Sequence, residues 1–259
     1  MFSVVIPTYN HADTLTTALL SVLKQTRLDL IEEIVIVDDG STDNTYEAVS
    51  DFKTSCKEVP IRYFKQENKG ASAARNYGIK NSAGEWIALL DADDEWISNK
   101  IEKQYECICK NDGMCFLGSF YPIRFLFKKY DGLVKVNAHQ LCIRSMPYTP
   151  SVVFKKNVGI ELGLFPEDMR FNEDANFFQK FLLKDSYYLL SDNLVTIDNG
   201  KSYSSEKGLS SNVKAMYDGK KRNMKELKEM GLISGFYCTF MCLFCDVKYL
   251  RKLIVNLLR

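Results

Sequence analysis

The sequence predicts an α/β fold in which a mostly parallel central sheet is covered by helices. Three apolar segments, at residues 4–6, 34–37 and 86–90, have the length and composition of buried strands. Each segment ends in a polar loop, and segments with a helical spacing of apolar residues lie between them. Strands that alternate with helices form parallel sheets through crossover connections. Ligands bind beyond the carboxyl ends of such strands, so we expect the polar loops to form one site.

The remaining elements are expected from the hydrophobic periodicity and from breakers along the chain. We expect strands at residues 4–6, 34–37, 60–64, 86–90 and 152–154, and helices at residues 15–23, 48–52, 70–81, 101–110 and 173–183. Asn10 or Asp13 can cap the first helix, and the aromatic residues 114–127 predict one or two strands. Residues 146–151 contain two prolines and predict a rigid turn, whereas residues 201–212 predict a mobile loop.

The composition is that of one globular domain with an appendage. A chain of 259 residues, of which 46% are hydrophobic, can bury one substantial core. Its eight cysteines are scattered and lack the spacing of a usual zinc site, so we expect reduced thiols. The chain enters a strand directly after Met1 without a signal-peptide pattern, and we therefore expect a cytosolic protein. The net charge of the whole chain is +1, but it is unevenly distributed. Residues 214–259 carry ten basic and four acidic residues and have a net charge of +6, so residues 1–213 have a net charge of −5.

The most informative segment is Asp91-Ala92-Asp93-Asp94, which follows the apolar run at residues 86–90. A solvated acidic turn is the simple interpretation, but Mg²⁺ typically takes one or two carboxylates and completes its shell with phosphate oxygens and water. Alternation along an extended chain would put Asp91 and Asp93 on one side. The chain has neither a phosphate-binding loop nor a glycine-rich dinucleotide motif, so we expect these two carboxylates to hold Mn²⁺ or Mg²⁺ on a diphosphate-bearing substrate.

Five polar motifs follow one another along the chain. They are Val5-Ile6-Pro7-Thr8-Tyr9-Asn10, Val37-Asp38-Asp39-Gly40-Ser41-Thr42-Asp43, Asn68-Lys69-Gly70-Ala71-Ser72-Ala73-Ala74-Arg75-Asn76, Leu90-Asp91-Ala92-Asp93-Asp94 and Asn172-Glu173-Asp174. Together and in this order they resemble the motifs of glycosyltransferase family 2, the inverting nucleotide-sugar transferases with a GT-A fold. The resemblance covers residues 3–200. The chain's small size and C-terminal tail are most similar to enzymes that extend lipid-linked bacterial surface polysaccharides.

The resemblance implies a GT-A nucleotide-binding α/β/α sandwich with a C-terminal helical tail. Residues 1–213 would form the catalytic domain, with a nucleotide-sugar-binding half at 1–98 and an acceptor-binding half at 99–213; residues 214–259 would form a basic amphipathic helical region. The implied activity moves a sugar with inversion from a nucleotide sugar, by preference a UDP-hexose, to a sugar hydroxyl on a lipid-diphosphate-linked glycan. The expected partners are this donor, this acceptor and the inner-membrane surface, with no nucleic acid among them. The enzyme would be peripheral on the cytoplasmic face, and its oligomeric state is left open.

The donor-binding residues that the resemblance implies are Pro7, Thr8, Tyr9, Asp39, Lys69, Gly70, Arg75, Asp91, Ala92 and Asp93. The ring of Tyr9 can pack against uracil. Asp39 would accept a hydrogen bond from uracil N3–H, which cytosine lacks, while Asp38 braces the loop. Gly70 permits a close approach of the backbone, and Arg75 would contact the nucleotide or Asp91.

The resemblance also assigns the metal and the base. Asp93 would be the principal metal ligand, with Asp91 closer to the ribose. Asp174 would be the general base that an inverting transfer requires, although an acid pair that favours a helix N-terminus is the alternative. Many family members carry a His or Arg in a loop after the base, and residues 201–212 contain neither. The candidates for acceptor or diphosphate contacts are Glu173, Tyr148, Lys201 and Lys207.

The C-terminal tail combines apolar and basic residues. Residues 232–245 are apolar at eleven of fourteen positions, which is too short for the ~20 residues of a membrane span. An apolar stripe follows, consisting of Val247, Leu250, Leu253, Ile254, Leu257 and Leu258, flanked by Lys248, Arg251, Lys252 and Arg259. Such a helix suits an anionic leaflet, and packing against the catalytic domain or a second subunit is the alternative.

Two other classes of function can use paired aspartates. A metal-dependent phosphatase would carry D-x-D-x-T after its first strand, but position 95 is Glu and the motif here follows about the fourth strand. A metal-dependent nucleotidyltransferase remains an alternative. A non-catalytic nucleotide-sugar-binding protein would have no need of a base, and the presence of Asp174 argues against it.

Overall fold

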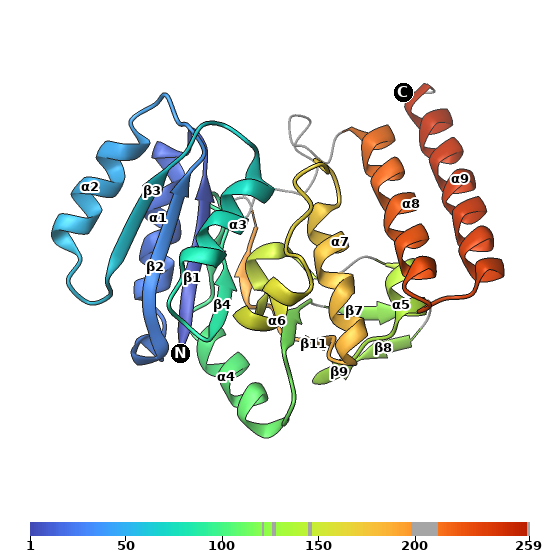
Figure 1. Cartoon of the computed structure of the whole chain (residues 1–259), viewed down its shortest axis with the longest axis horizontal. Coiled ribbons are helices and arrows are strands. Elements are labelled where there is room, and N and C mark those ends of the chain that lie inside the picture. Colours follow the sequence, from blue (N-terminus) through green and yellow to red (C-terminus); the bar gives the residue numbers. More distant parts are fainter. Residues whose placement is uncertain (121, 126–127, 145–146, 198–211, 258–259) are drawn as a thin grey trace.

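A computed structural model describes residues 1–120, 122–125, 128–144, 147–197 and 212–257. A central sheet lies between layers of helices, and two long helices stand side by side at one end of the molecule (Figure 1). The strands of the central sheet are, in order across it, β3 (Ile61–Lys65), β2 (Ile31–Asp38), β1 (Phe2–Thr8), β4 (Trp86–Leu89), β10 (Val153–Lys155), β6 (Phe116–Ser119), β11 (Tyr188–Leu190) and β9 (Leu133–Lys135). The α/β fold class is therefore confirmed.

The central sheet has a parallel half and a mixed half. Strands β3, β2, β1 and β4 are all parallel to one another. β10 is antiparallel to both of its neighbours, β11 is parallel to β6, and β9 is antiparallel to β11. Two short pairs lie outside this sheet, β5 (Glu95–Trp96) with β12 (Val195–Thr196), and β7 (Ile123–Phe125) with β8 (Lys128–Tyr130). The predicted, mostly parallel sheet is confirmed.

Helices connect the strands in the expected alternation. The α-helices are α1 (Ala12–Leu23), α2 (Thr45–Ser55), α3 (Ala71–Asn81), α4 (Lys100–Lys110), α5 (Ala138–Ile143), α6 (Lys156–Glu161), α7 (Glu173–Gln179), α8 (Val213–Glu229) and α9 (Gly235–Leu257). The described residues also form the 3₁₀ helices η1 (Leu28–Leu30), η2 (Thr149–Ser151) and η3 (Lys180–Lys184). The helix predicted at residues 173–183 thus ends at Gln179 and continues as η3.

The core has two layers because side chains of a strand alternate between the faces of a sheet. Val4 and Ile6 pack on one face with Leu15 and Leu19 of α1. Val5 packs on the other face, in a cluster with residues of α3 and the phenylalanines of α7. Both faces are covered, so strands β1, β2 and β4 are apolar along nearly their whole length.

The cap predicted for the first helix is wrong. His11 is the N-cap of α1 and makes no capping hydrogen bond with its side chain. Asn10 has a left-handed backbone, with φ of 57°, and its Oδ1 accepts a hydrogen bond from the Thr42 amide instead. Asp43 supplies the missing acceptor, because its Oδ2 accepts from the Ala12 amide at 3.1 Å. The first two polar loops are therefore joined to each other.

The C-terminal tail is a helical hairpin of α8 and α9. One side of α9 packs onto α8 and α5 in a third hydrophobic cluster, which includes Cys142, Met224, Cys238, Met241 and Cys245. The packed side of α9 is not the stripe predicted from the sequence, because Val247 and Leu250 of that stripe are exposed. Within the described part of the chain, none of the helices combines the length and apolar content that crossing a bilayer requires.

Candidate active site

The polar loops after β1, β2 and β4 lie at one edge of the sheet, because these strands are parallel neighbours. The backbone joins them: the Asp39 amide donates to the Thr8 carbonyl at 2.8 Å. The start of α3 joins the same edge through its preceding residues, Lys69 and Gly70, whose amides donate to the Asp39 carboxylate at 2.8 and 2.7 Å. Sequence motifs one to four thus come together at one edge of the sheet.

Asp39 is buried where the loops after β1, β2 and β3 meet. Besides the two backbone amides, its Oδ1 accepts a hydrogen bond from Gln66 Nε2 at 2.7 Å. Three of the roughly four acceptor positions of the carboxylate are therefore used within the protein, which leaves one. Asp39 thus fixes the loop before α3, in addition to the base-reading role that the sequence predicts for it.

Asp38 is entirely buried and braces the loop after β2. Its Oδ1 accepts from the Ser41 amide at 2.6 Å, and its Oδ2 accepts from the Tyr63 hydroxyl. Burial raises the pKa of Tyr63 above its ordinary value, and the hydrogen bond to Asp38 adds to this effect. This agrees with the bracing role expected for Asp38.

Gly70 has a φ of 91°, which a residue with a side chain adopts only with strain. A Cβ atom placed here would meet nothing within 4 Å. Glycine is therefore required by the backbone conformation and not by a lack of space. The close approach of the backbone that was predicted for Gly70 stays a prediction, and the structure leaves room for it. The space beside Gly70 is open at the N-terminus of α3, where backbone amides favour anions.

Arg75 connects α3 to the loop after β4 and to the start of α7. Its Nη2 lies 2.7 Å from Asp91 Oδ1, and its Nη1 lies 3.5 Å from Glu173 Oε1. The guanidinium carbon stands 5.4 Å from the ring centroid of Phe165. Burial alone would lower the pKa of Arg75, but Asp91 and Glu173 raise it above its ordinary value. The guanidinium of Arg75 therefore holds the loop that contains Asp91 next to Glu173 at the start of α7.

The acidic motif after β4 is a turn, in which the Asp94 amide donates to the Asp91 carbonyl at 3.2 Å. The extended conformation expected for it is wrong. Asp91 and Asp93 are nevertheless both partly exposed, whereas Ala92 and Asp94 are buried. Arg75 engages Oδ1 of Asp91, and no hydrogen bond to its Oδ2 joins it to another described residue.

The donor set at this turn fits a hard divalent cation that is shared with a substrate. Nowhere in the described ranges do three or more His, Cys, Asp or Glu side chains gather in a metal-binding group. A site that consists of one or two carboxylates, with phosphate oxygens as the other ligands, is what Mg²⁺ and Mn²⁺ accept. Asp91 and Asp93 can meet that requirement together with a diphosphate.

Three buried polar atoms in this region have no hydrogen-bond partner among the described residues: Thr8 Oγ1, Ser72 Oγ and Arg75 Nε. They belong to the end of β1 and to the first turns of α3. An unpaired buried polar group costs about 1–3 kcal/mol, so such groups are rare. Their concentration at one edge of the sheet indicates a place where a polar ligand binds.

The acid pair stands at the start of α7. Asp174 Oδ2 accepts a hydrogen bond from Thr149 Oγ1 at 3.1 Å, and its Oδ1 accepts from the Ala175 amide at 2.6 Å. Burial, followed by the charge of Asp174, raises the pKa of Glu173 to about 7. Glu173 can therefore carry a proton near neutral pH, whereas the carboxylate of Asp174 accepts hydrogen bonds from Thr149 and from the Ala175 amide.

A polar contact with α8 fixes the start of α7. Asn172 has a left-handed backbone, with φ of 58°, and its Nδ2 donates to the Met216 carbonyl at 2.8 Å. Asn223 Nδ2 donates to the Asn172 carbonyl at 3.0 Å, and Asn176 Nδ2 donates to Asn223 Oδ1 at 2.9 Å. A Cβ atom at Gly219 would lie 2.4 Å from the Phe171 carbonyl, so α8 passes this segment at backbone distance. The hairpin thus supports the acid pair.

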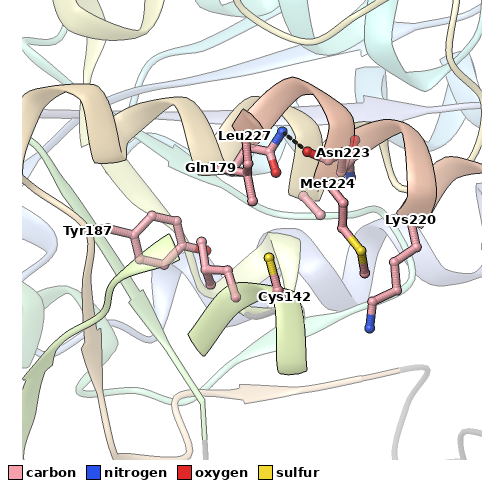
Figure 2. A pocket seen from close by; sticks show the side chains of 9 residues that line it. Cys142, Gln179, Tyr187, Lys220, Asn223, Met224 and Leu227 are labelled. Atoms are coloured by element: carbon pink, nitrogen blue, oxygen red, sulfur yellow. Dashed lines mark hydrogen bonds between the residues drawn. The ribbon is translucent and has the colours of Figure 1, made fainter. Parts of the chain in front are cut away.

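Figure 2 shows the interior of this support, where Gln179 donates a hydrogen bond to the Asn223 carbonyl at 3.2 Å. The side chains of Cys142, Tyr187 and Lys220 come from three different segments and face the same cavity. Its volume of about 20 Å³ suits a water molecule. The cavity is too small for a nucleotide sugar and is part of the packing between α5, α7 and α8.

The other predicted site residues take different positions. Tyr9 is 45% exposed at the end of β1, so its ring is accessible to a base. Tyr148 stacks on Phe120, with ring centroids 4.9 Å apart, and precedes the turn that contacts Asp174. Lys201 and Lys207, and with them the loop predicted at residues 201–212, lie outside the described residues except for Asn212.

Two contacts were not predicted from the sequence. Thr149, which binds Asp174, belongs to a segment that predicts only a rigid turn, although a hydroxyl beside Pro150 was a usable signal. Gln66 binds Asp39 from the loop after β3, and nothing in its sequence surroundings distinguishes it from a surface residue.

The sheet order, the acidic turn after β4 and the acid pair on α7 define a glycosyltransferase of the GT-A type. Residues 3–157, more than half of the chain, match the family described as Glycosyl transferase family 2. The chain belongs to this family, and the predicted family is confirmed.

Similar proteins agree with this assignment. The chain is 36% identical over 178 residues to an uncharacterized glycosyltransferase of Rickettsia conorii, and the match covers 67% of this chain and 28% of that protein. It is 37% identical over 120 residues to WfgD of Escherichia coli, named a UDP-Glc:alpha-D-GlcNAc-diphosphoundecaprenol beta-1,3-glucosyltransferase, with 46% of each chain covered. The chain thus spans less than half the length of these relatives.

Among solved structures, S. aureus TarS in complex with UDP-GlcNAc has a similar fold. The TM-score is 0.64 at 22% identity, and the likeness covers 87% of this chain and 66% of that chain. At this level of identity, the likeness concerns the fold.

Proposed function

We propose that the protein transfers a sugar, with inversion, from a UDP-sugar to a sugar hydroxyl of a lipid-diphosphate-linked glycan for a surface polysaccharide. The observation that carries the proposal is the ion-pair bridge of Arg75 to Asp91 and Glu173. It brings the acidic turn, suited to a diphosphate, beside the acid pair, suited to proton transfer. A donor and a reacting hydroxyl would then meet at one place.

The donor would bind at the edge of the sheet where β1, β2 and β4 end. The exposed ring of Tyr9 is available for stacking on uracil, and the remaining acceptor position of Asp39 suits uracil N3–H. The unpaired Thr8 Oγ1, Ser72 Oγ and Arg75 Nε are available to polar groups of the nucleotide. Pro7, Lys69 and Ala92 belong to the same loops and complete the proposed donor-binding set.

Asp93, with Asp91, would hold Mn²⁺ or Mg²⁺ together with the two phosphates of the donor. The bound cation neutralises negative charge on the diphosphate and on the UDP that leaves. Arg75 already engages Oδ1 of Asp91.

Asp174 would accept the proton of the acceptor hydroxyl as that oxygen attacks the anomeric carbon from the face opposite UDP. Thr149 and the Ala175 amide donate to its two oxygens and fix its orientation. Glu173, Tyr148 and the segment containing Lys201 and Lys207 would meet the acceptor or the diphosphate. We assign residues 1–213 to the catalytic domain, with its halves at 1–98 and 99–213, and residues 214–259 to a helical region at the cytoplasmic face of the inner membrane.

The first test is UDP release with a panel of UDP-sugars and an undecaprenyl-diphosphate-linked sugar, with Mn²⁺ or with EDTA. We expect UDP release that requires both the acceptor and Mn²⁺, and NMR of the product should show the anomeric configuration inverted. Retention would contradict the single displacement. Release of a sugar phosphate in place of UDP would instead support a nucleotidyltransferase, and release of inorganic phosphate would support a phosphatase.

A second test separates the base from the binding residues. Asp174→Asn should lower kcat by roughly 10² to 10⁴, the contribution of a positioned general base, and leave UDP-sugar affinity unchanged. Asp51→Asn, at an exposed acid on α2, is the matched control and should leave kcat unchanged. Loss of donor affinity in Asp174→Asn would make Asp174 a binding or structural residue.

A further inference from the structure

Helix α9 exposes a stripe of large apolar side chains. It consists of Phe236, Phe240, Leu243, Val247 and Leu250, here called the outer face. Their spacing of three and four residues places them on one side of the helix, opposite the buried Cys238, Met241 and Cys245. Phe236 is 86% exposed and Val247 is 64% exposed. Figure 1 shows α9 at the edge of the molecule, with α8 between it and the sheet.

Basic side chains line one flank of the outer face. Lys221, Lys225 and Lys228 of α8 line a cleft of about 360 Å³ together with Glu229 and with Thr239 and Cys242 of α9. Lys221 pairs with Asp246 at 3.1 Å. Lys225 and Lys228 are exposed and form no ion pair with any described residue, so both charges are available to an external anion.

The other flank is basic as well. The Nζ of Lys248 lies 4.3 Å from the ring centroid of Phe244, and Arg251 and Lys252 are exposed one turn further along the helix. Residues 213–257 carry nine basic residues and four acidic residues, so their net charge is +5. An apolar stripe between two basic flanks matches the boundary between the acyl chains and the head groups of an anionic leaflet.

We propose that the outer face of α9 lies flat on an anionic phospholipid leaflet, with Phe236, Phe240 and Val247 inserted and with Lys225 and Lys228 against phosphate groups. The proposal deepens the proposed function, because a lipid-linked acceptor is held at such a leaflet. It also extends the predicted stripe: Val247 and Leu250 belong to the outer face, and Phe236, Phe240 and Leu243 continue it toward the N-terminus of α9. The side chains of the remaining predicted members, residues 253–258, lie outside the described ones.

A second copy of the chain is a weaker candidate for the same face. Each outer face has two basic flanks, so contact between two copies would bring four groups of positive charges together without an acidic surface to neutralise them. The net positive charge of the hairpin therefore favours an anionic partner. A phosphate-rich lipid surface provides both the negative charge and the apolar depth that the phenylalanines require.

The test uses the full chain in co-sedimentation with vesicles of phosphatidylcholine alone and of phosphatidylcholine with phosphatidylglycerol at about 3:1. We expect binding to the anionic vesicles, and a loss of at least about tenfold in Phe240→Glu/Val247→Glu. Ile160→Glu, at an exposed apolar residue of α6, is the matched control and should bind as the unmodified protein does. Circular dichroism and Tm confirm that each variant is folded.

A second pair of variants tests the charges independently of the apolar residues. Lys225→Glu/Lys228→Glu should weaken binding to anionic vesicles at least about tenfold at 0.1 M salt. Lys53→Glu/Lys80→Glu changes the net charge equally on two exposed lysines of α2 and α3, and should retain most of the binding. Equal losses in both pairs would show that only net charge matters and would overturn the docking site.

Three further results would overturn the proposal. They are failure of the unmodified protein to bind anionic vesicles, unchanged binding by the Phe240→Glu/Val247→Glu variant, and a dimer that this variant converts to a monomer. Activity on a short soluble acceptor should be the same in every variant. An unmodified protein that binds vesicles but transfers no sugar would contradict the proposed function and leave the docking site standing.

Discussion

Asn223 Nδ2 on α8 donates a 3.0 Å hydrogen bond to the carbonyl oxygen of Asn172, the residue directly before Glu173. The C-terminal hairpin is thereby tied to the segment that carries the proposed base. Asn223 is buried, and its own carbonyl and Oδ1 accept from Gln179 and Asn176. It is a positioning residue in this arrangement and touches no substrate.

We expect Asn223→Ala to lower kcat several-fold or more while the affinity for the UDP-sugar stays the same, because the donor pocket lies on other elements. Stability should fall by about 1–3 kcal/mol, the cost of unpaired buried groups. Gln179→Ala is the matched control: it removes a bond to the same residue but keeps the link to Asn172. Equal effects on kcat in the two variants, measured by steady-state kinetics, would speak against positioning.

Asp93→Ala should remove the Mn²⁺ dependence of UDP binding, because the proposed principal metal ligand is lost and the diphosphate charge is no longer neutralised. Asp91→Ala should weaken binding less, since Arg75 already engages one oxygen of Asp91. Isothermal titration calorimetry with UDP, in Mn²⁺ and in EDTA, measures both effects. UDP affinity in Mn²⁺ that equals that of the unmodified protein would rule out Asp93 as the ligand.

Arg75→Ala should lower the free energy of unfolding by about 3–5 kcal/mol, the usual result of removing one partner from a buried charge pair. Asp91 and Glu173 would lose their common counter-charge. Arg27 offers a matched comparison, because its Nη2 also lies 2.7 Å from a carboxylate oxygen, that of Asp29, but this pair is exposed. Arg27→Ala should have little effect on urea denaturation. Similar losses in both variants would contradict the role of burial.

Glu173→Gln should change how stability depends on pH. The pKa of Glu173 is about 7 in the folded protein and near 4.5 when unfolded, because burial disfavours its charged form. Between these values the folded state holds a proton that the unfolded state has lost, so the unfolding free energy falls as pH rises through this window.

Glutamine cannot ionise, so the variant should be more stable than the unmodified protein at pH 8, by on the order of 3 kcal/mol, and this gain should vanish below about pH 4.5. Urea denaturation at pH 5 and pH 8 measures the difference. Glu32→Gln, at an exposed carboxyl, is the control. A gain that is equal at both pH values would exclude titration of Glu173 as its cause.

The parallel half of the fold could be predicted from the sequence because its signals are local. Strands β1, β2 and β4 are buried on both faces and therefore read as continuous apolar runs. The insertion of β10 between β4 and β6 could not be predicted, since it depends on pairing between segments far apart in the chain. The orientation of α9 also depends on tertiary contacts, because both of its sides contain apolar residues.

In the candidate site, too, features with local sequence signals could be predicted, and features that depend on tertiary contacts could not. Paired carboxylates after an apolar run singled out Asp91 and Asp93, and the family resemblance implied Asp39 and Asp174. The bridge from Arg75 to Glu173 was beyond the sequence, since it joins α3 to α7, which lie far apart in the chain. The same is true of Thr149, whose hydroxyl becomes important only when η2 packs beside α7.

The order of strands in the sheet also separates short-range from long-range pairing. Strands β3, β2, β1 and β4 all come from residues 2–89, so this half pairs neighbouring parts of the chain. β10 pairs with the other edge of β4, where Val153 lies opposite Ala88, and Glu173 contacts Arg75 across 98 positions of sequence. Contacts between distant parts of a chain slow folding, so we expect this protein to fold more slowly than a helical bundle of equal length.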